Sequence, residues 1–132
     1  MTMPASGDGV MAVVVAEGDA RPDRGGLEPA ARLFRTLGEP ARLAILSHLF
    51  LGEHNVRQLT EHLGLSQSTV SAHLRCLLDC GLVQVRAVGR ASVYSLAVGS
   101  EVLEVLAAAE RLLAVTGAAV VLRPRYAVGG AQ

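Results

Sequence analysis

The strongest constraint on this chain is a change in residue pattern at Gly81. Before it, two short segments carry apolar residues at helical spacing, Val56–Leu63 and Ser66–Gly81. A turn that contains Gly64 separates them, and Asn55 stands where an N-cap side chain would begin the first. Two short helices joined by a glycine-containing turn form a helix-turn-helix. We therefore expect Ser66–Gly81 to be the second helix of that motif.

After Gly81 the pattern becomes that of β-strands. Residues 82–88 are rich in β-branched side chains, and after Gly89 and Arg90 a second short run follows at residues 91–96. This arrangement predicts a two-stranded hairpin whose tip presents Arg90, with Arg86 nearby. A helix-turn-helix followed at once by a hairpin predicts a mainly α fold with a small β-hairpin, the winged helix-turn-helix.

Further helices are expected on both sides of this motif. Apolar spacing predicts helices at Leu27–Leu37 and from Pro40 to Gly52, and the second is central because it is apolar on most sides. Residues 53–55 are expected to form a loop. The last helix, Glu101–Val115, is too apolar to lie in water on its own. We therefore expect it to pair with a second copy in a homodimer, together with Leu27–Leu37.

The length of 132 residues predicts one domain with tails. We expect a flexible leader at 1–26, the DNA-binding and dimerisation domain at 27–117, and a tail without regular core structure at 118–132. The apolar run Val10–Ala16 is too short to span a bilayer and lacks the basic residue of a signal peptide. We therefore expect a cytoplasmic protein with no membrane partner.

Nothing in the sequence is typical of catalysis. We find no nucleophile with a neighbouring base, no phosphate-binding glycine loop and no acid pair, so we expect no enzymatic activity. His48 and His62 have no visible partner set in the sequence, which favours a structural or solvated role for each. The two cysteines are too few for the disulfide framework of a secreted protein.

Small polar side chains gather at the start of the Ser66–Gly81 helix. Such side chains can contact base edges and phosphates. The net charge is zero, but residues 66–96 hold three arginines against a single acidic residue, Asp79. The candidate DNA-binding residues are Gln67, Ser68, Thr69, Ser71, His73, Arg75 and Arg90. The alternatives are a solvated polar face and, for Arg75, a pair with Asp79 four residues on.

Cys76 and Cys80 are four residues apart near the end of the same helix. At that spacing both sulfurs lie on one helix face, which suits two ligands of one soft metal ion and disfavours a disulfide. His73 shares this face and could be a third ligand or a DNA contact. The alternative is that both cysteines are small buried apolar residues.

Residues 33–115 resemble the ArsR/SmtB family of bacterial winged-helix repressors. Within that family, residues 74–83, which contain the cysteine pair, are most similar to the CmtR-type cadmium and lead sensors of actinobacteria. The segments that carry the resemblance are Leu37–Leu46, Leu59–Leu74, Gly81–Val83 and Gly89–Leu96.

The resemblance implies a homodimeric repressor that binds double-stranded operator DNA and releases it when an inducer binds. It also implies that the inducer is a soft divalent ion, Cd²⁺ or Pb²⁺, bound by Cys76 and Cys80, with no metal required for folding. CmtR-type sensors take a third thiolate from the C-terminal tail, and this tail has no cysteine. The third donor would then be His73, His54, Asp79 or an exogenous thiol.

Other metal sites of the family are not expected in this chain. Residues 101–116 contain no histidine, and residues 56–63 contain no cysteine. Two alternatives to metal sensing remain. One is the same DNA-binding regulator with a redox or other non-metal input, and the other is a dimeric interaction protein that does not bind DNA.

Overall fold

The structure is a computed structural model that describes residues 23–123. Contacts divide the chain into two compact units, residues 1–32 and 33–132. In the first unit a short 3-10 helix, η2 (Gly25–Leu27), precedes helix α2 (Glu28–Leu37), which continues into the second unit. The predicted leader lies outside the described residues up to position 22, and so does the predicted tail beyond position 123.

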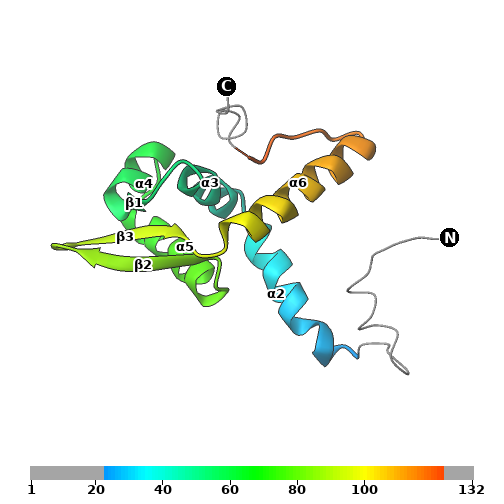
Figure 1. The fold of residues 1–132 in the computed structure, drawn as a ribbon, viewed down its shortest axis with the longest axis horizontal. Helices are drawn as coiled ribbons and strands as arrows, with labels where there is room; N and C mark the ends of the chain where they lie inside the picture. The colour runs from blue at the N-terminus through cyan, green and yellow to red at the C-terminus, as the bar shows by residue number, and fades with distance from the viewer. Residues whose placement is uncertain (1–22, 124–132) are drawn as a thin grey trace. The chain divides into compact units, whose positions relative to one another are not determined.

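The second unit is a winged helix-turn-helix, as predicted. Helices α4 and α5 form the helix-turn-helix, and strands β2 and β3 form a hairpin that projects away from the helices (Figure 1). None of the helices among residues 23–123 is both long and apolar enough to cross a membrane. The elements after α2 are α3 (Pro40–Leu49), β1 (His54–Asn55), α4 (Val56–Leu63), α5 (Gln67–Asp79), β2 (Val83–Val88), β3 (Ala91–Leu96) and α6 (Gly99–Val115).

Local signals in the sequence set the ends of α4. The Asn55 side chain accepts a hydrogen bond from the Gln58 backbone at 2.8 Å, and the Gln58 side chain accepts one from the Asn55 backbone. This reciprocal pair is a capping box, which satisfies backbone donors that the first helical turn leaves free. Gly64 ends the helix with φ of 70°, a left-handed conformation that favours glycine.

The β structure contains one strand more than predicted. His54 and Asn55, expected in a loop, pair with Tyr94 and Val93 and form the third strand of a sheet with the order β1-β3-β2. A two-residue strand is too short to show an alternating pattern, so its pairing depends on where β3 lies in space. The predicted hairpin is observed with its turn at Gly89 and Arg90, where Val88 lies opposite Ala91.

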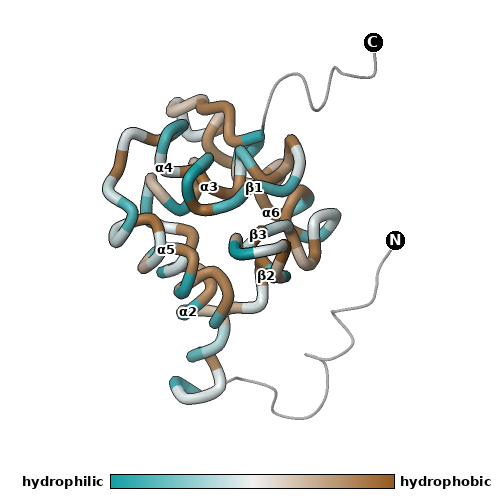
Figure 2. Tube along the Cα trace, turned by 90° about the vertical axis from the view of Figure 1, so that its left-hand side faces the viewer, coloured by the Kyte–Doolittle hydropathy of each residue, from teal (hydrophilic) through white to brown (hydrophobic). Residues whose placement is uncertain are grey.

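The core is aliphatic and centres on α3, as the sequence predicts. Hydrophobic residues also make up much of α6 (Figure 2). On α5, Val70, Leu74 and Leu77 are fully buried and form the inner face of the helix. The remaining buried apolar residues are Ile45, Leu46, Leu49, Leu59, Leu82, Val83, Val102 and Leu106.

The C-terminal segment is attached to α6 by a carboxylate. The side chain of Glu110 accepts hydrogen bonds from the backbone N–H groups of Leu122 and Arg123 at 2.7 and 3.0 Å. The Arg123 guanidinium donates two more to the same carboxylate, the shorter at 2.6 Å. Residues 118–123 form no helix or strand, as expected, but Leu122 packs against the core, which we did not predict.

Three histidines far apart in the sequence form a cluster of rings. The ring centroids of His48 and His62 lie 5.0 Å apart, and that of His54 lies 5.3 Å from His62. The Nδ1 atoms of His48 and His54 are hydrogen-bonded to the backbone carbonyls of Ala44 and Gly52. These rings therefore join α3, β1 and α4, which gives His48 and His62 partners that spacing along the chain did not indicate.

Candidate nucleic-acid interface and thiol pair

The outer face of α5 presents the small polar side chains that the sequence singled out. The hydroxyl of Ser66 caps the helix by accepting a hydrogen bond from the Thr69 backbone at 3.2 Å and donates one to Thr69 Oγ1 at 2.8 Å. These bonds fix the first turn of the helix. Ser68 and Ser71 are also exposed, so this turn offers hydroxyl groups to the solvent.

A polar hollow joins the start of α5 to the wing. It has a volume of about 350 Å³, and Gln67 from α5 and Arg90 from the hairpin turn both line it. Arg57 from α4 lines the same hollow. Its Nε lies 3.6 Å from Oε2 of Glu61 in an exposed ion pair. The folded chain therefore brings together two residues predicted to contact DNA from positions 23 residues apart in the sequence.

Two other arginines predicted near this surface are paired with carboxylates. Nη1 of Arg75 lies 3.9 Å from Oδ1 of Asp79. This is the helical ion pair that the sequence left open as the alternative to a DNA contact for Arg75. Arg86 donates to both carboxylate oxygens of Glu53 at 2.7 and 2.9 Å and so connects β2 to the residue before β1. Such an exposed pair contributes about 1 kcal/mol or less to the free energy of unfolding.

His73 is half-buried and has a partner on another helix. Its Nδ1 lies 3.2 Å from Nη1 of Arg42, which belongs to α3. The predicted role of His73 as a metal ligand therefore competes with this hydrogen bond, because a nitrogen that accepts from a guanidinium has no free lone pair for an ion.

The two cysteines differ in their surroundings. Both are free thiols; Cys76 is exposed, whereas Cys80 is half-buried at the C-cap of α5. The Cys80 thiol donates a hydrogen bond to Oγ1 of Thr36 at 3.5 Å. Within residues 23–123 no three His, Cys, Asp or Glu side chains are arranged to hold a metal ion, the histidine cluster included. The chain thus supplies two soft donors on one helix. Among the described residues, none of the side chains that the sequence suggested as a third donor lies with them in an arrangement that could hold a metal ion.

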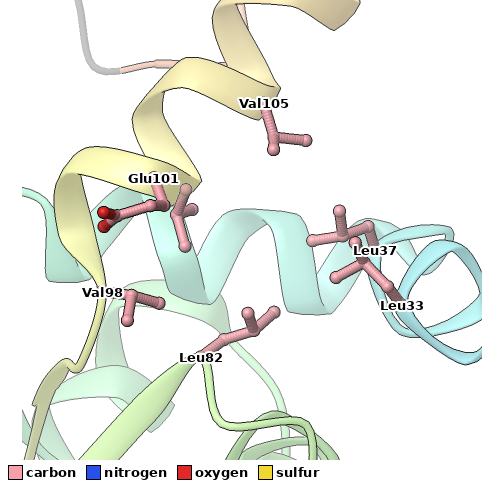
Figure 3. A pocket seen from close by; sticks show the side chains of 7 residues that line it. Leu33, Leu37, Leu82, Val98, Glu101 and Val105 are labelled. Atoms are coloured by element: carbon pink, nitrogen blue, oxygen red, sulfur yellow. The ribbon is translucent and has the colours of Figure 1, made fainter. Parts of the chain in front are cut away.

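An apolar pocket lies between α2 and α6. Figure 3 shows Leu33 and Leu37 of α2 and Val105 of α6 around it, with Leu82 at the start of the wing. Its volume is about 140 Å³. The same two helices expose further large apolar side chains, among them Phe34 and Leu112, each 65% exposed. These are the two helices on which the sequence predicted contact with a second copy.

Comparison with known proteins agrees with this geometry. Residues 39–85 match the family described as bacterial regulatory protein, arsR family. The uncharacterized HTH-type transcriptional regulator Rv0081 of Mycobacterium tuberculosis is 38% identical over 85 residues, which cover 64% of this chain and 74% of that protein. The chain belongs to the ArsR family. This confirms the resemblance predicted from the sequence, and the relatives of this ArsR protein are named as regulators rather than enzymes.

Two further relatives of this ArsR-family chain are similar to it over a shorter stretch. The "Probable mercury resistance operon repressor" of Streptomyces lividans is 44% identical over 52% of this chain and 54% of its own length. The HTH-type transcriptional regulator CmtR of Mycobacterium tuberculosis is 49% identical over 51% of this chain and 57% of its own length. The chain therefore spans little more than half the length of these two relatives.

Two solved structures resemble this ArsR-family chain over most of their own length. The crystal structure of Rv0081 superposes with a TM-score of 0.65 at 34% identity and covers 71% of this chain and 94% of that one. The homodimeric winged helix-turn-helix DNA-binding domain Mb0332 of Mycobacterium bovis superposes with a TM-score of 0.60 at 32% identity, covering 70% and 86%.

Proposed function

We propose that this ArsR-family protein is a homodimeric transcriptional repressor that binds double-stranded operator DNA and releases it when a soft metal ion binds. In this proposal α5 enters the major groove and Arg90 of the wing contacts the flanking backbone or minor groove. The ion, Cd²⁺ or Pb²⁺, is held by Cys76 and Cys80.

The observation that carries the DNA-binding part is the polar hollow shared by Gln67 and Arg90. A helix that reads bases needs backbone contacts to fix its register, and a wing arginine beside the first turn of α5 can supply one. The exposed hydroxyls and amide of that turn suit base edges and phosphates, because they can donate and accept.

Replacing Arg90 with alanine is expected to weaken operator binding by about three- to tenfold, because one phosphate or groove contact per subunit is lost. The measurement is fluorescence anisotropy with the DNA upstream of the protein's own gene, at several salt concentrations. The salt dependence should become shallower in R90A. The control is Arg111→Ala, which removes the same charge from an exposed position on α6.

Equal affinities for the two variants would contradict the assignment of Arg90. A second outcome concerns the wild-type protein. If it showed no preference for the upstream DNA over an unrelated duplex, the result would favour the alternative that the protein is a dimeric interaction protein that does not bind DNA. The same titration tests the homodimer, because the proposal requires two chains bound to each operator.

The proposed dimer rests on the apolar surface of α2 and α6. Phe34, Leu112 and Val115 are more than half exposed, and the adjoining pocket is lined almost entirely by aliphatic side chains. Exposed apolar area of this kind is stabilised by contact with a complementary surface. A second copy would carry the same surface across a twofold axis, and it would also place a second α5 on the DNA.

The metal part of the proposal rests on chemistry rather than on a completed site. Thiolates are the side chains that soft ions prefer, and two of them one helical turn apart can bind a single ion. The relatives named as a mercury resistance operon repressor and as CmtR make a soft metal the favoured class of inducer. The further donor that such an ion requires would come from an exogenous thiol or from a rearranged side chain.

Changing both cysteines to serine is expected to leave operator affinity within about twofold of wild type and to abolish release by metal. Serine keeps the size of the side chain but is a poor ligand for soft ions. Anisotropy with Cd²⁺, Pb²⁺, Hg²⁺, Zn²⁺ and arsenite added in turn would also identify the inducer. A double variant that still releases DNA with metal would place the metal site elsewhere.

A redox input is the alternative that the exposure of Cys76 favours, because an exposed thiol is open to oxidants. In that case peroxide, rather than metal, would release the operator from the wild-type protein. Mass spectrometry of the treated protein would then show added oxygen on Cys76 or Cys80.

A further inference from the structure

Three helices meet at the guanidinium of Arg42. Its Nε donates to the backbone carbonyl of Thr36 at 2.7 Å, and its Nη2 donates to that of Arg35 at 3.2 Å. Both carbonyls are in the last turn of α2, and that of Arg35 also accepts a hydrogen bond from the Gly38 backbone at 3.2 Å. The Nη1 atom reaches His73 on α5. One side chain on α3 therefore connects the end of α2 to α5.

This contact determines which nitrogen of His73 carries the proton. A guanidinium has donors only, so Nδ1 of His73 must accept the hydrogen bond. The proton of the neutral ring then resides on Nε2. As a result His73 offers a donor at Nε2, which suits a phosphate oxygen or the O6 and N7 acceptors of guanine.

Thr36 connects the same network to the thiol end of α5. Thr36 is 7% exposed and is the buried polar residue among those described. Its carbonyl binds Arg42, and its hydroxyl accepts the hydrogen bond from the Cys80 thiol. A continuous path of hydrogen-bonded groups thus runs from Cys80 through Thr36 and Arg42 to His73.

We propose that Arg42 positions His73 for DNA contact and that Thr36 and Arg42 transmit the chemical state of the Cys80 thiol to His73. This inference rests on the proposed function for the DNA and for the inducer that acts on Cys80. It adds two positioning residues, Thr36 and Arg42, that neither touch DNA nor bind the ion.

The physical basis is a reversal of one hydrogen bond. A thiol donates its proton to Thr36, whereas a sulfur that has given up its proton to bind a soft ion can only accept. The Thr36 hydroxyl, which can act in either direction, must then rotate and donate to the sulfur. A hydrogen bond to an ionised sulfur is also shorter than one from a thiol, so it would draw the packed Thr36 toward Cys80 and shift the carbonyl that holds Arg42.

The first test of the inference needs no DNA. Nitrogen-15 NMR of the histidine rings at alkaline pH, where imidazoles are neutral, reports which nitrogen is protonated. The signals of His73 are identified by their loss in His73→Gln. We expect wild type to have the proton on Nε2 and Arg42→Met to have both tautomers, with Arg42→Lys between them. Identical His73 signals in wild type and Arg42→Met would overturn the role of Arg42.

The second test follows the path from Cys80. Cys80→Ala removes the donor and is expected to shift the His73 signals, whereas Cys80→Ser keeps a donor and is expected to leave them close to wild type. In a Thr36→Val background, which removes only the acceptor hydroxyl, the alanine and serine variants should give the same spectrum. If they already give the same spectrum with Thr36 present, the transmission is disproved.

Operator binding separates this inference from the proposed function. We expect Arg42→Met to weaken binding by about five- to twentyfold. Added Cd²⁺ should weaken wild-type binding by about five- to 150-fold, the usual range of allosteric coupling, and this factor should fall to less than half in Thr36→Val. A wild-type protein that binds no operator would refute the proposed function, while the NMR results would still decide the network. An unchanged Cd²⁺ factor in Thr36→Val would refute the network alone.

Discussion

Replacing Leu74 with alanine is expected to lower the free energy of unfolding by about 3 kcal/mol. Leu74 is fully buried on the inner face of α5. Removing most of its side chain eliminates apolar contacts and leaves a cavity in the core. A loss of this size is a large fraction of the 5–15 kcal/mol that stabilises a typical domain. The measurement is urea unfolding followed by far-ultraviolet circular dichroism at one protein concentration, because the proposed dimerisation would make stability depend on concentration.

The matched control for Leu74 is Ser71→Ala on the exposed face of the same helix, which should change stability by about 0.5 kcal/mol or less. Ser71→Ala is a control for stability only, because Ser71 is itself a candidate DNA contact and its loss should also weaken DNA binding. L74A is expected to weaken DNA binding by loosening the packing of α5 against the core, even where the protein is still folded. A destabilisation by L74A of less than about 1 kcal/mol would show that α5 is not anchored through this side chain.

Replacing Glu110 with glutamine is expected to lower the free energy of unfolding by about 1–2 kcal/mol at neutral pH, as expected for charge-assisted hydrogen bonds that are partly open to solvent. The side-chain hydrogen bonds of Arg123 are the main cause that lowers the Glu110 pKa from 4.5 to about 2. Burial opposes this shift, and the backbone N–H groups of Leu122 and Arg123 add to it. Glutamine can still accept from those N–H groups, so the variant removes mainly the charge.

The pH dependence follows from the direction of this shift. Because the folded protein holds the Glu110 proton more weakly than the unfolded chain does, the ionised carboxylate stabilises the fold. This contribution is complete above a pH of about 4.5 and is lost as the pH falls toward about 2. In Glu110→Gln the corresponding pH dependence should be absent.

Amide hydrogen exchange at Leu122 and Arg123 gives a local readout, since their N–H groups bind Glu110 directly. After correction for the intrinsic rate, their protection should fall in the acidic range in wild type, whereas in E110Q it should be lower than in wild type at neutral pH and should not change in the acidic range. Glu104→Gln, an exposed carboxylate on the same helix, is the control and should change neither quantity. Equal protection in E110Q and wild type at neutral pH would show that the charge of Glu110 does not hold the segment.

The elements that sequence reasoning located well are those with local causes. Helix α4 was predicted at its observed bounds, because Asn55 and Gln58 cap it and Gly64 ends it within one short segment. The wing was predicted with its turn because a β-branched run ends at Gly89 and a second short run follows directly after Arg90. By contrast, β1 was missed, since two residues have no pattern of their own and form a strand only where β3 offers free backbone groups.

The candidate site divides in the same way. The polar start of α5 and the cysteine pair are visible along the chain, because residues three or four apart share a helix face. The pairing of Arg86 with Glu53 joins residues 33 apart, and nothing in the local sequence predicts it. The Glu110 contacts with Leu122 and Arg123 depend equally on the path of the chain after α6.

By itself, the sequence of this protein determined its fold class, the order of its helices and of the two wing strands, and its membership of a family of regulators. These properties follow from periodicity, caps and turns, which act over a few residues. Only the tertiary structure decided that Gln67 and Arg90 share a hollow and that Cys80 is linked to His73 through Thr36 and Arg42. Such contacts depend on how α2, α3 and α5 pack around the aliphatic core, and packing brings together side chains whose spacing in the sequence carries no period.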